Sequence, residues 1–365
     1  MKSRSLVAIL SSLCLSAVIA ASAQARDYLL TTTKPNTLHL VDVAARKVER
    51  SYVIPGEGSP LGMVVSPDGK VAYMTTNHWG SLVGIDLDSG KEVFRAGFSQ
   101  GDIRSRNTFG LEISPDGKEL FVMLSAARLG QGEYEVLDSH IAVYRTDAGL
   151  DAKPARILPV PRRTTSLFMS KDGSRLWALS WDLHTLDPAD GRVLKVDKVI
   201  NWDRTDRTPP DVFGNWLQHE QTGVYAGPYY TTRPDLDPKD PNASRTGMMT
   251  LDLTTGRVTM AEFENTEAIM FSTVINPVRR NETFSVYNTL TKTDLDTNTL
   301  VKRVKLPHTY YCLNISADGR EIYLGGTMND IGIYSTETLE RIGQIDLPGG
   351  NDMGGTWMRM VKRDP

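Results

Sequence analysis

Short stretches of alternating apolar and polar residues, separated by turn residues, run through most of the chain. Within 61–96, for example, four such stretches cover 62–65, 71–75, 82–87 and 93–96. Stretches of this length, each bounded by Gly, Pro, Asp or Ser, predict β-strands. The 3.6-residue periodicity of an amphipathic helix is almost absent. The pattern therefore predicts an all-β protein.

Two turn motifs recur along the chain, at intervals of about 40 to 60 residues. The first is Ser-Pro-Asp-Gly at 66–69 and 114–117, with the variants 170–173 and 316–319. In this motif Pro presets φ, Asp bonds its own backbone and Gly takes the left-handed conformation. Each copy is therefore expected to end one strand and start the next.

The second motif is a hydrophobic-Asp-hydrophobic run that ends in a polar turn. It is clearest at 85–91 and 251–257. Less regular copies lie at 40–46, 143–150, 186–192, 293–299 and 333–339. The two motifs are the hairpin connections of one four-stranded unit, and seven such units predict a seven-bladed β-propeller.

The two ends of the chain are expected to share one blade. Residues 27–33 lead directly into the first polar turn with no innermost strand before them, and 355–361 form an unpartnered strand at the other end. Together they complete one blade, which hides the sheet edges and closes the ring. We therefore predict a single seven-bladed propeller domain over 26–365, closed by N- and C-terminal strands in one blade.

The first 25 residues have the features of a cleaved export signal. Lys2 and Arg4 precede an apolar stretch at 6–20, and small residues alternate at 21–25. About 15 apolar residues are fewer than the roughly 20 that span a bilayer. We therefore predict that 1–25 is removed and that the mature protein is periplasmic. Without Lys2 and Arg4 the excess of acidic residues grows, which argues against a nucleic-acid partner.

Few residues in the mature chain carry recognisable catalytic or cofactor chemistry. Cys14 lies in the signal, so Cys312 is the single remaining thiol. One thiol excludes an internal disulfide, a C-x-x-C-H haem attachment, an iron–sulfur cluster and a cysteine-based zinc site. The six histidines lack a ligand spacing, and nucleotide-binding and nucleophile-elbow motifs are missing. We therefore expect no catalytic, cofactor-binding or metal-binding residues in this chain.

Function is sought where the chain departs from the average repeat, because a bare propeller repeat specifies no chemistry. Three insertions stand out, at 100–107, 125–139 and 227–245. The last is the longest and includes Tyr229 and Tyr230. Loops of this length are usually functional or disordered, and this one could be either a partner-facing loop or a stiff excursion of the surface.

Aromatic residues mark the starts of the innermost strands, which lie at one mouth of a propeller's central channel. They occur in the segments 108–110, 213–216, 270–272 and 310–312, and His308 is close by. Propellers commonly bind ligands or partners at such a mouth, although aromatic residues also fill gaps between blades. The candidate contact residues are Phe109, Trp216, Tyr229, Tyr230, Phe271, His308, Tyr310 and Tyr311.

From Arg26 onward the chain resembles the β subunit of quinohaemoprotein amine dehydrogenase, a bacterial periplasmic enzyme. Four ordered segments carry this resemblance: 26–30, 182–188, 229–247 and 306–311. The long insertion of the fifth unit is among them. It is thus a feature of the family rather than an addition peculiar to this chain.

The resemblance implies a division of labour between three subunits. In this family the α subunit carries two c-type haems, and a small γ subunit carries cysteine tryptophylquinone. The β subunit is a seven-bladed propeller without a cofactor that supports γ and helps to enclose its active site. The complex oxidises primary amines to aldehydes and ammonia, and it passes electrons through the haems to a small periplasmic carrier. The candidate contact residues would then face γ or wall its substrate pocket.

Two other functions stay open at this point. A stand-alone periplasmic propeller of the surface-layer or lactonase-like type shares the generic turn repeat and needs no partner. The heavy subunit of methylamine dehydrogenase is also a seven-bladed propeller beside a quinone-bearing subunit, but it works without a dihaem partner.

Overall fold

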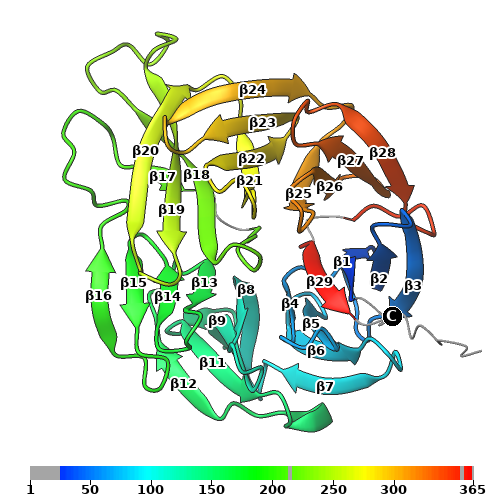
Figure 1. The fold of residues 1–365 in the computed structure, drawn as a ribbon. Coiled ribbons are helices and arrows are strands. Elements are labelled where there is room, and N and C mark those ends of the chain that lie inside the picture. The colour runs from blue at the N-terminus through cyan, green and yellow to red at the C-terminus, as the bar shows by residue number, and fades with distance from the viewer. Residues whose placement is uncertain (1–24, 213–215, 354–356, 364–365) are drawn as a thin grey trace, which may run out of the picture.

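The computed structural model describes residues 25–212, 216–353 and 357–363. Seven antiparallel sheets stand around a central channel, as the view along the channel shows (Figure 1). This confirms the predicted all-β, seven-bladed propeller. The predicted signal lies outside the described residues except for Ala25.

The blades are numbered here in chain order, and their strands are given from the channel outward. Blade 1 holds β29 (Arg359–Arg363), β1 (Arg26–Thr33), β2 (Thr37–Asp42) and β3 (Lys47–Val53). Blade 2 holds β4 (Met63–Val65), β5 (Val71–Thr76), β6 (Ser81–Asp86) and β7 (Glu92–Gly97). Blade 3 holds β8 (Ile103–Ile113), β9 (Glu119–Leu129), β11 (His140–Arg145) and β12 (Arg156–Pro159), with β10 (Tyr134–Val136) added to β9 and a 3₁₀ turn at Gly149–Asp151.

The other four blades follow the same order. Blade 4 holds β13 (Ser166–Met169), β14 (Leu176–Leu179), β15 (Leu183–Leu186) and β16 (Val193–Asp197). Blade 5 holds β17 (Asp211–Val212), β18 (Val224–Thr232), β19 (Ser244–Asp252) and β20 (Val258–Asn265). Blade 6 holds β21 (Met270–Ile275), β22 (Glu282–Tyr287), β23 (Thr289–Asp294) and β24 (Thr299–Lys305). Blade 7 holds β25 (Tyr310–Ile315), β26 (Glu321–Gly326), β27 (Asp330–Ser335) and β28 (Arg341–Asp346).

The ring closes within blade 1, as the sequence predicts. β29 pairs antiparallel with β1, with Arg359 opposite Leu30 and Arg363 opposite Arg26. The closing strand is found at Arg359–Arg363 rather than at 355–361, and 354–356 lie outside the described residues. Because the last strand is innermost and the first strand lies next to it, both chain ends are held in one sheet.

The repeated turns form as the two motifs predict. In the first Ser-Pro-Asp-Gly copy, the Ser66 hydroxyl donates to Asp68 (2.5 Å) and accepts from the Val71 amide (2.9 Å), while Gly69 has φ +70°. The bond from Ser66 lowers the pKa of the Asp68 carboxyl. In the second motif Asp86 accepts from the Ser89 amide at 2.7 Å. Each Asp therefore closes its turn through its own side chain.

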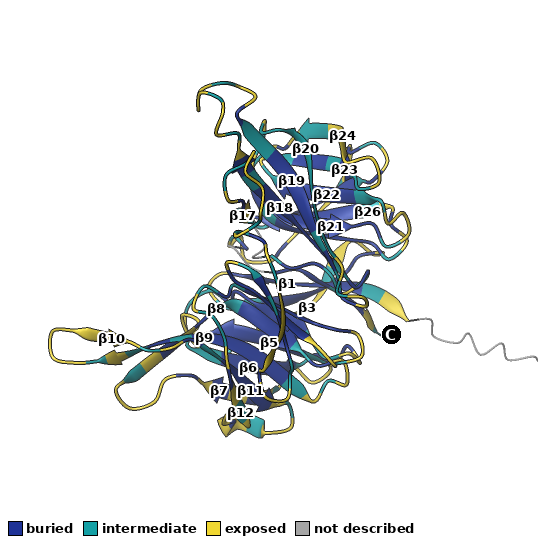
Figure 2. Ribbon diagram, turned by 90° about the vertical axis from the view of Figure 1, so that its left-hand side faces the viewer, coloured by how far each residue is buried: buried dark blue, intermediate teal, exposed yellow. Residues whose placement is uncertain are grey.

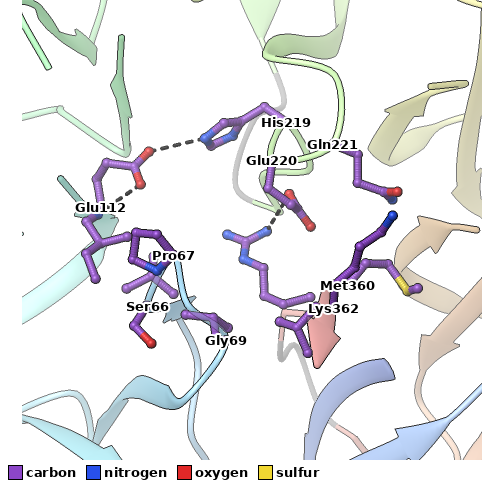
Figure 3. A pocket seen from close by; sticks show the side chains of 14 residues that line it. Ser66, Pro67, Gly69, Glu112, His219, Glu220, Gln221, Met360 and Lys362 are labelled. Carbon is purple, nitrogen blue, oxygen red and sulfur yellow. Dashed lines mark hydrogen bonds and ion pairs between the residues drawn. The ribbon is translucent and has the colours of Figure 1, made fainter. Parts of the chain in front are cut away.

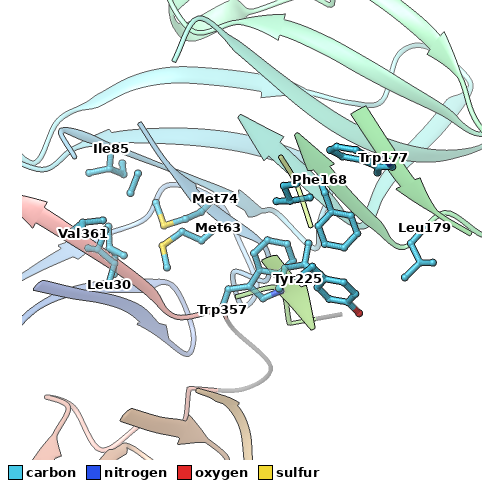
Figure 4. Packing of buried hydrophobic residues seen from close by; sticks show 14 of the residues in the cluster. Leu30, Met63, Met74, Ile85, Phe168, Trp177, Leu179, Tyr225, Trp357 and Val361 are labelled. Carbon is cyan, nitrogen blue, oxygen red and sulfur yellow. The ribbon is translucent and has the colours of Figure 1, made fainter. Parts of the chain in front are cut away.

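Apolar side chains fill the spaces between blades and part of the channel. Separate clusters pack blades 2 with 3, 3 with 4, 5 with 6, 6 with 7 and 7 with 1. The largest cluster joins blades 1 and 2 to blades 4 and 5, and Trp357 belongs to it together with Met63, Phe168 and Tyr225 (Figure 4). Trp357 is fully buried within this cluster.

The two faces of the ring are distinguished by which loops they carry. The upper face is the one on which the innermost strands begin, and it also carries the loops from the second to the third strand of each blade. The lower face carries the Ser-Pro-Asp-Gly turns, which join the innermost strand of a blade to the second. All three insertions, 100–107, 125–139 and 227–245, therefore emerge on the upper face. The hairpin of β9 and β10 extends well beyond the ring there (Figure 2).

Candidate partner-binding site

A connected group of six aromatic rings lies at the upper mouth of the channel, and we call it the aromatic cluster. Trp216 is at its centre, stacked on Phe271 and Tyr311 with ring centroids 5.8 Å from it in both cases. Phe109 meets Trp216 edge-on at 6.3 Å. The cluster comprises Trp79, Phe109, Trp216, Phe271, Tyr287 and Tyr311.

Bulges in the innermost strands turn these rings toward the mouth. In β21 the register shifts between Met270 and Ser272, so Phe271 has no paired residue on the neighbouring strand. In β25 the register shifts in the same way between Tyr310 and Cys312, so Tyr311 has no paired residue either. The residues on either side stay buried in the sheet while the bulged residue is half exposed. A one-residue bulge thus sets the direction of each ring.

Gly326 makes the bulge of blade 7 sterically possible. A Cβ atom at this position would lie 2.6 Å from the Tyr311 amide nitrogen, which is closer than atoms can approach. The direction of the Phe109 ring is set by a stronger distortion of the backbone. Phe109 has φ +75°, a conformation that residues with bulky side chains rarely adopt. Asn107 supports this turn by donating to the carbonyls of Gly110 (2.9 Å) and Met123 (3.0 Å).

Four of the eight predicted contact residues, Phe109, Trp216, Phe271 and Tyr311, are brought together by the fold. Tyr230 lies nearby, but its hydroxyl is occupied: it accepts from the Met270 amide (2.6 Å) and donates to the Met270 carbonyl (3.2 Å). Burial raises the pKa of Tyr230 to about 12. Tyr230 therefore fixes the start of β21 rather than presenting its hydroxyl to a partner.

Two predicted contact residues, Tyr229 and Tyr310, are completely buried. Tyr229 packs edge-on against Trp202, with ring centroids 5.9 Å apart, inside the core of blade 5. The Tyr310 hydroxyl donates to Asp330 at 2.9 Å within the blade 6–blade 7 core. Burial, together with this bond, raises the pKa of Tyr310 far above its ordinary value. Contrary to the prediction, neither side chain lies on a surface that a partner can reach.

His308 belongs to a polar group around Asp330 at the edge of the upper face. Its Nε2 lies 2.9 Å from Asp330, its Nδ1 lies 3.1 Å from the Thr309 carbonyl, and Arg341 lies 3.2 Å from the same carboxylate. The imidazole ring also packs on the ring of Tyr310, with 4.2 Å between the ring centroids. His308 therefore anchors the loop that leads to Tyr311.

Sequence reasoning missed two members of the aromatic cluster, Trp79 and Tyr287. Both lie where the second strand of a blade ends, whereas the sequence pattern points to the starts of the innermost strands. Trp79 follows Asn77 and His78 in a tight loop where all three residues have φ between +52° and +65°. The run Asn-His-Trp-Gly after a strand, on the face where innermost strands begin, is the signal that identifies this position.

Further exposed apolar side chains lie on the upper face, outside the aromatic cluster. Trp181, half exposed, lies under the Arg163 guanidinium at 4.0 Å, and Tyr134 and Val136 are exposed on β10. Ile269 and Met328 add two more apolar side chains in loops of the same face. These exposed side chains make the upper face a candidate interaction surface.

Several kinds of functional group are missing from the described part of the chain. Within it, no three His, Cys, Asp or Glu side chains are grouped so that they could hold a metal ion. Nor does any helix there have the length and apolar character needed to cross a membrane. Cys312 is buried, and burial raises the pKa of its thiol far above the ordinary value.

Comparison with known proteins establishes the fold but not the family. No family model matches the chain, and no curated protein matches it significantly. Among solved structures it is similar to hydrazine synthase from Kuenenia stuttgartiensis, with a TM-score of 0.59, 17% identity, and coverage of 84% of this chain and 90% of the other. The chain is also similar to the dihydro-heme d1 dehydrogenase NirN in complex with DHE. For this pair the TM-score is 0.55 and the sequence identity 13%, with coverage of 91% of this chain and 74% of the other.

A functionally unknown protein from Desulfotomaculum acetoxidans is similar over 93% of this chain and 99% of its own, with a TM-score of 0.59 and 10% identity. At these identities the likeness shows the β-propeller fold alone. No sequence-level match identifies an amine dehydrogenase subunit.

Proposed function

We propose that this chain is the cofactor-free β subunit of a periplasmic amine dehydrogenase complex that oxidises primary amines to aldehydes and ammonia. In this proposal a γ subunit with cysteine tryptophylquinone sits on the upper face, beside an α subunit with two c-type haems. Export would follow from the signal at 1–25. The ordered sequence motifs that resemble this family are one support.

The single observation that carries the proposal is the aromatic cluster together with the apolar side chains around it. Trp79, Trp181, Tyr134 and Met328 are 40%, 53%, 74% and 51% exposed on the same face. Exposed Trp, Tyr and Met side chains are enriched at protein interfaces.

The role of this chain in the reaction would be to bind and enclose rather than to react. Phe109, Trp216, Phe271 and Tyr311 would form an apolar wall against the partner's active site. Excluding water there strengthens the electrostatic interactions of charged groups inside the pocket. Cysteine tryptophylquinone, when bound in the partner, supplies the redox chemistry.

Purification of the native protein from its source periplasm tests this function. We expect two further chains to co-elute, with the visible bands of haem c and an amine-dependent bleaching of the spectrum. A colourless monomer would contradict the proposal and favour a stand-alone propeller. A complex that is bleached by amine but lacks haem would favour the heavy subunit of a methylamine dehydrogenase.

A further inference from the structure

A polar cavity lies between blades 2 and 3 on the upper face, beside the aromatic cluster. Its volume is about 350 Å³, and its walls come from the loop between β5 and β6, the end of β7 and the start of β8. His78 and Gly80 line it. Trp79, which lies between these two residues, belongs to the aromatic cluster, with 6.4 Å between its ring centroid and that of Phe109. One loop therefore shapes both the cavity and the apolar surface.

The insertion 100–107 supplies the charge of this cavity, because Arg104 and Arg106 both line it. The two residues are two positions apart in β8, so their side chains lie on the same side of the strand. Both are exposed, whereas Ser105 between them is 4% exposed. The alternation of the strand thus brings two guanidinium groups to one cavity, which we call the arginine cavity.

Neither arginine has an acidic partner among the described residues. Their hydrogen bonds go to backbone carbonyls instead: Arg104 donates to Gly101 at 2.9 Å, and Arg106 donates to His78. A carbonyl bond orients a guanidinium group but does not neutralise its charge. Both positive charges are therefore positioned and uncompensated.

The acidic residues of the neighbouring loops are directed elsewhere. Asp102, the single acid of the insertion, lies 3.5 Å from Arg128. Glu57 lies 3.9 Å from His78, but it is 86% exposed and does not line the arginine cavity. All the described residues that do line it lack a carboxyl group.

Other cavities of the protein contain carboxylates next to their cations. Glu220 reaches into a cavity on the lower face (Figure 3), where it lies 3.6 Å from Arg359. Asp240 lines a cavity of blade 5 together with Arg245. The arginine cavity differs from these two because its cations have no acid beside them, so its positive charge is available to a ligand.

Backbone hydrogen bonds hold the insertion in place. Gln100 and Ile103 exchange N–H···O bonds of 3.0 and 2.9 Å, and the Asn107 amide donates to the Trp79 carbonyl at 2.9 Å. The backbone that carries the two arginines is therefore fixed before anything binds. Less conformational freedom is then lost on binding.

The chemistry of the arginine cavity favours a carboxylate carried by a protein. A guanidinium group pairs through two parallel hydrogen bonds with a carboxylate or a phosphate. The chain has 41 Lys plus Arg against 44 Asp plus Glu, which disfavours a polyanion such as nucleic acid. Water screens a free carboxylate at an exposed site. A carboxylate on a protein that covers the aromatic cluster would instead be held in place and shielded from water.

We propose that the arginine cavity receives an acidic side chain of the subunit that docks on the aromatic cluster. The proposal rests on the function proposed above and adds the chemistry of the partner's surface: an apolar centre over the aromatic cluster, with Asp or Glu at its edge over Arg104 and Arg106. Such a charge pair speeds association and fixes the orientation of the docked subunit.

Surface plasmon resonance of the chain with the proposed partner subunits tests this. Arg104→Gln combined with Arg106→Gln should slow association about fivefold or more at about 0.05 M salt. The difference should shrink at about 1 M salt, where charges are screened. The matched control is Arg175→Gln combined with Arg257→Gln, which removes the same charge from exposed positions on the lower face. It should leave the association rate nearly unchanged.

Carbodiimide coupling provides a second measurement in which the positive charge is kept. Arg106→Lys adds an amine that carbodiimide joins to a carboxylate in direct contact with it. We expect mass spectrometry to find a link between position 106 and an Asp or Glu of the partner. No link, or a link only to an acid of this chain such as Glu57, would overturn the proposal.

The two proposals fail in different ways. A double variant, Arg104→Gln with Arg106→Gln, that associates at the wild-type rate would overturn the acidic contact and leave the docked partner standing. A wild-type chain that binds no partner would overturn the proposed function, and the acidic contact with it.

Discussion

The indole ring of Trp216 lies almost parallel to the phenyl ring of Phe271, with 7° between the planes and 5.8 Å between the centroids. The two residues belong to neighbouring blades, and the Ser272 hydroxyl holds the pair in register by donating to the Trp216 carbonyl at 3.3 Å. Tyr311 from the next blade stacks on both rings. Three blades thus build one apolar surface at the upper mouth.

Replacing Tyr311 tests whether this surface binds a partner. Tyr311→Ser removes a half-buried ring that stacks on Trp216 and Phe271 but lies outside the core clusters between blades, so the chain should keep its fold. Association with the proposed partner subunits should weaken by about 2 kcal/mol, roughly 30-fold, as is typical of an aromatic anchor. The dissociation constant of the complex, measured by surface plasmon resonance, checks this.

The matched control for this substitution is Val278→Ala on the lower face, where Val278 is 60% exposed. It should leave the dissociation constant unchanged. Equal affinities for wild type and Tyr311→Ser would remove Tyr311 from the interface.

The neighbouring residue Tyr310 should behave in the opposite way. Tyr310→Phe removes the hydroxyl that donates to the buried Asp330 but keeps the ring, and Arg341 still contacts the carboxylate. We expect a loss of about 1 kcal/mol in the free energy of unfolding and no change in partner binding. Urea denaturation combined with the same binding assay measures both. A binding defect without a stability change would place Tyr310 at the surface.

Gly326→Ala tests the bulge that directs Tyr311. The added methyl group would lie 2.6 Å from the Tyr311 amide nitrogen, so the strand must shift, at a cost of about 1–3 kcal/mol. Gly97→Ala is the control, because a Cβ there meets no described atom within 4 Å. Urea denaturation of both variants should show destabilisation for Gly326→Ala alone. Equal stabilities would mean that the bulge tolerates a side chain.

The buried His39 predicts a stability change in mild acid. It is 1% exposed, its ring contacts the hydroxyls of Thr33 and Ser51 at 2.9 Å, and burial lowers its pKa from 6.5 to about 4. Between these values the unfolded chain binds a proton at His39 that the folded chain does not. Stability should therefore fall as the pH is lowered from 6.5 towards 4, by at most about 1.4 kcal/mol per pH unit.

Urea denaturation at several pH values between 7 and 4.5 checks this, with His39→Gln as the comparison. The variant should be less sensitive to pH over this range than the wild type. Identical pH profiles would show that His39 does not contribute.

The architecture was predictable because its signals are local. Each Ser-Pro-Asp-Gly turn closes through its own Ser and Asp side chains, so the strand boundaries around Ser66 and Gly69 follow from neighbouring residues. Ring closure was predictable too, because the first unit lacks an innermost strand and the strand at the C-terminus has no blade of its own.

The site was only partly predictable, because its geometry depends on register. Tyr310 and Tyr311 look equivalent in the sequence, but the bulge in β25 buries the first and turns the second to the mouth. Glu112 and His219, 107 residues apart, meet across the channel. Contacts of this kind arise from the arrangement of the blades and leave no local pattern.

Hydrogen–deuterium exchange of the native complex, compared with the isolated chain, tests the central claim most directly. The account predicts protection in the complex at the upper-face segments 100–107, 125–139, 227–245, 269–272 and 309–311, and little change in the Ser-Pro-Asp-Gly turns of the lower face. Protection confined to the lower face or to the outer strands would contradict it, because the partner would then bind away from the aromatic cluster.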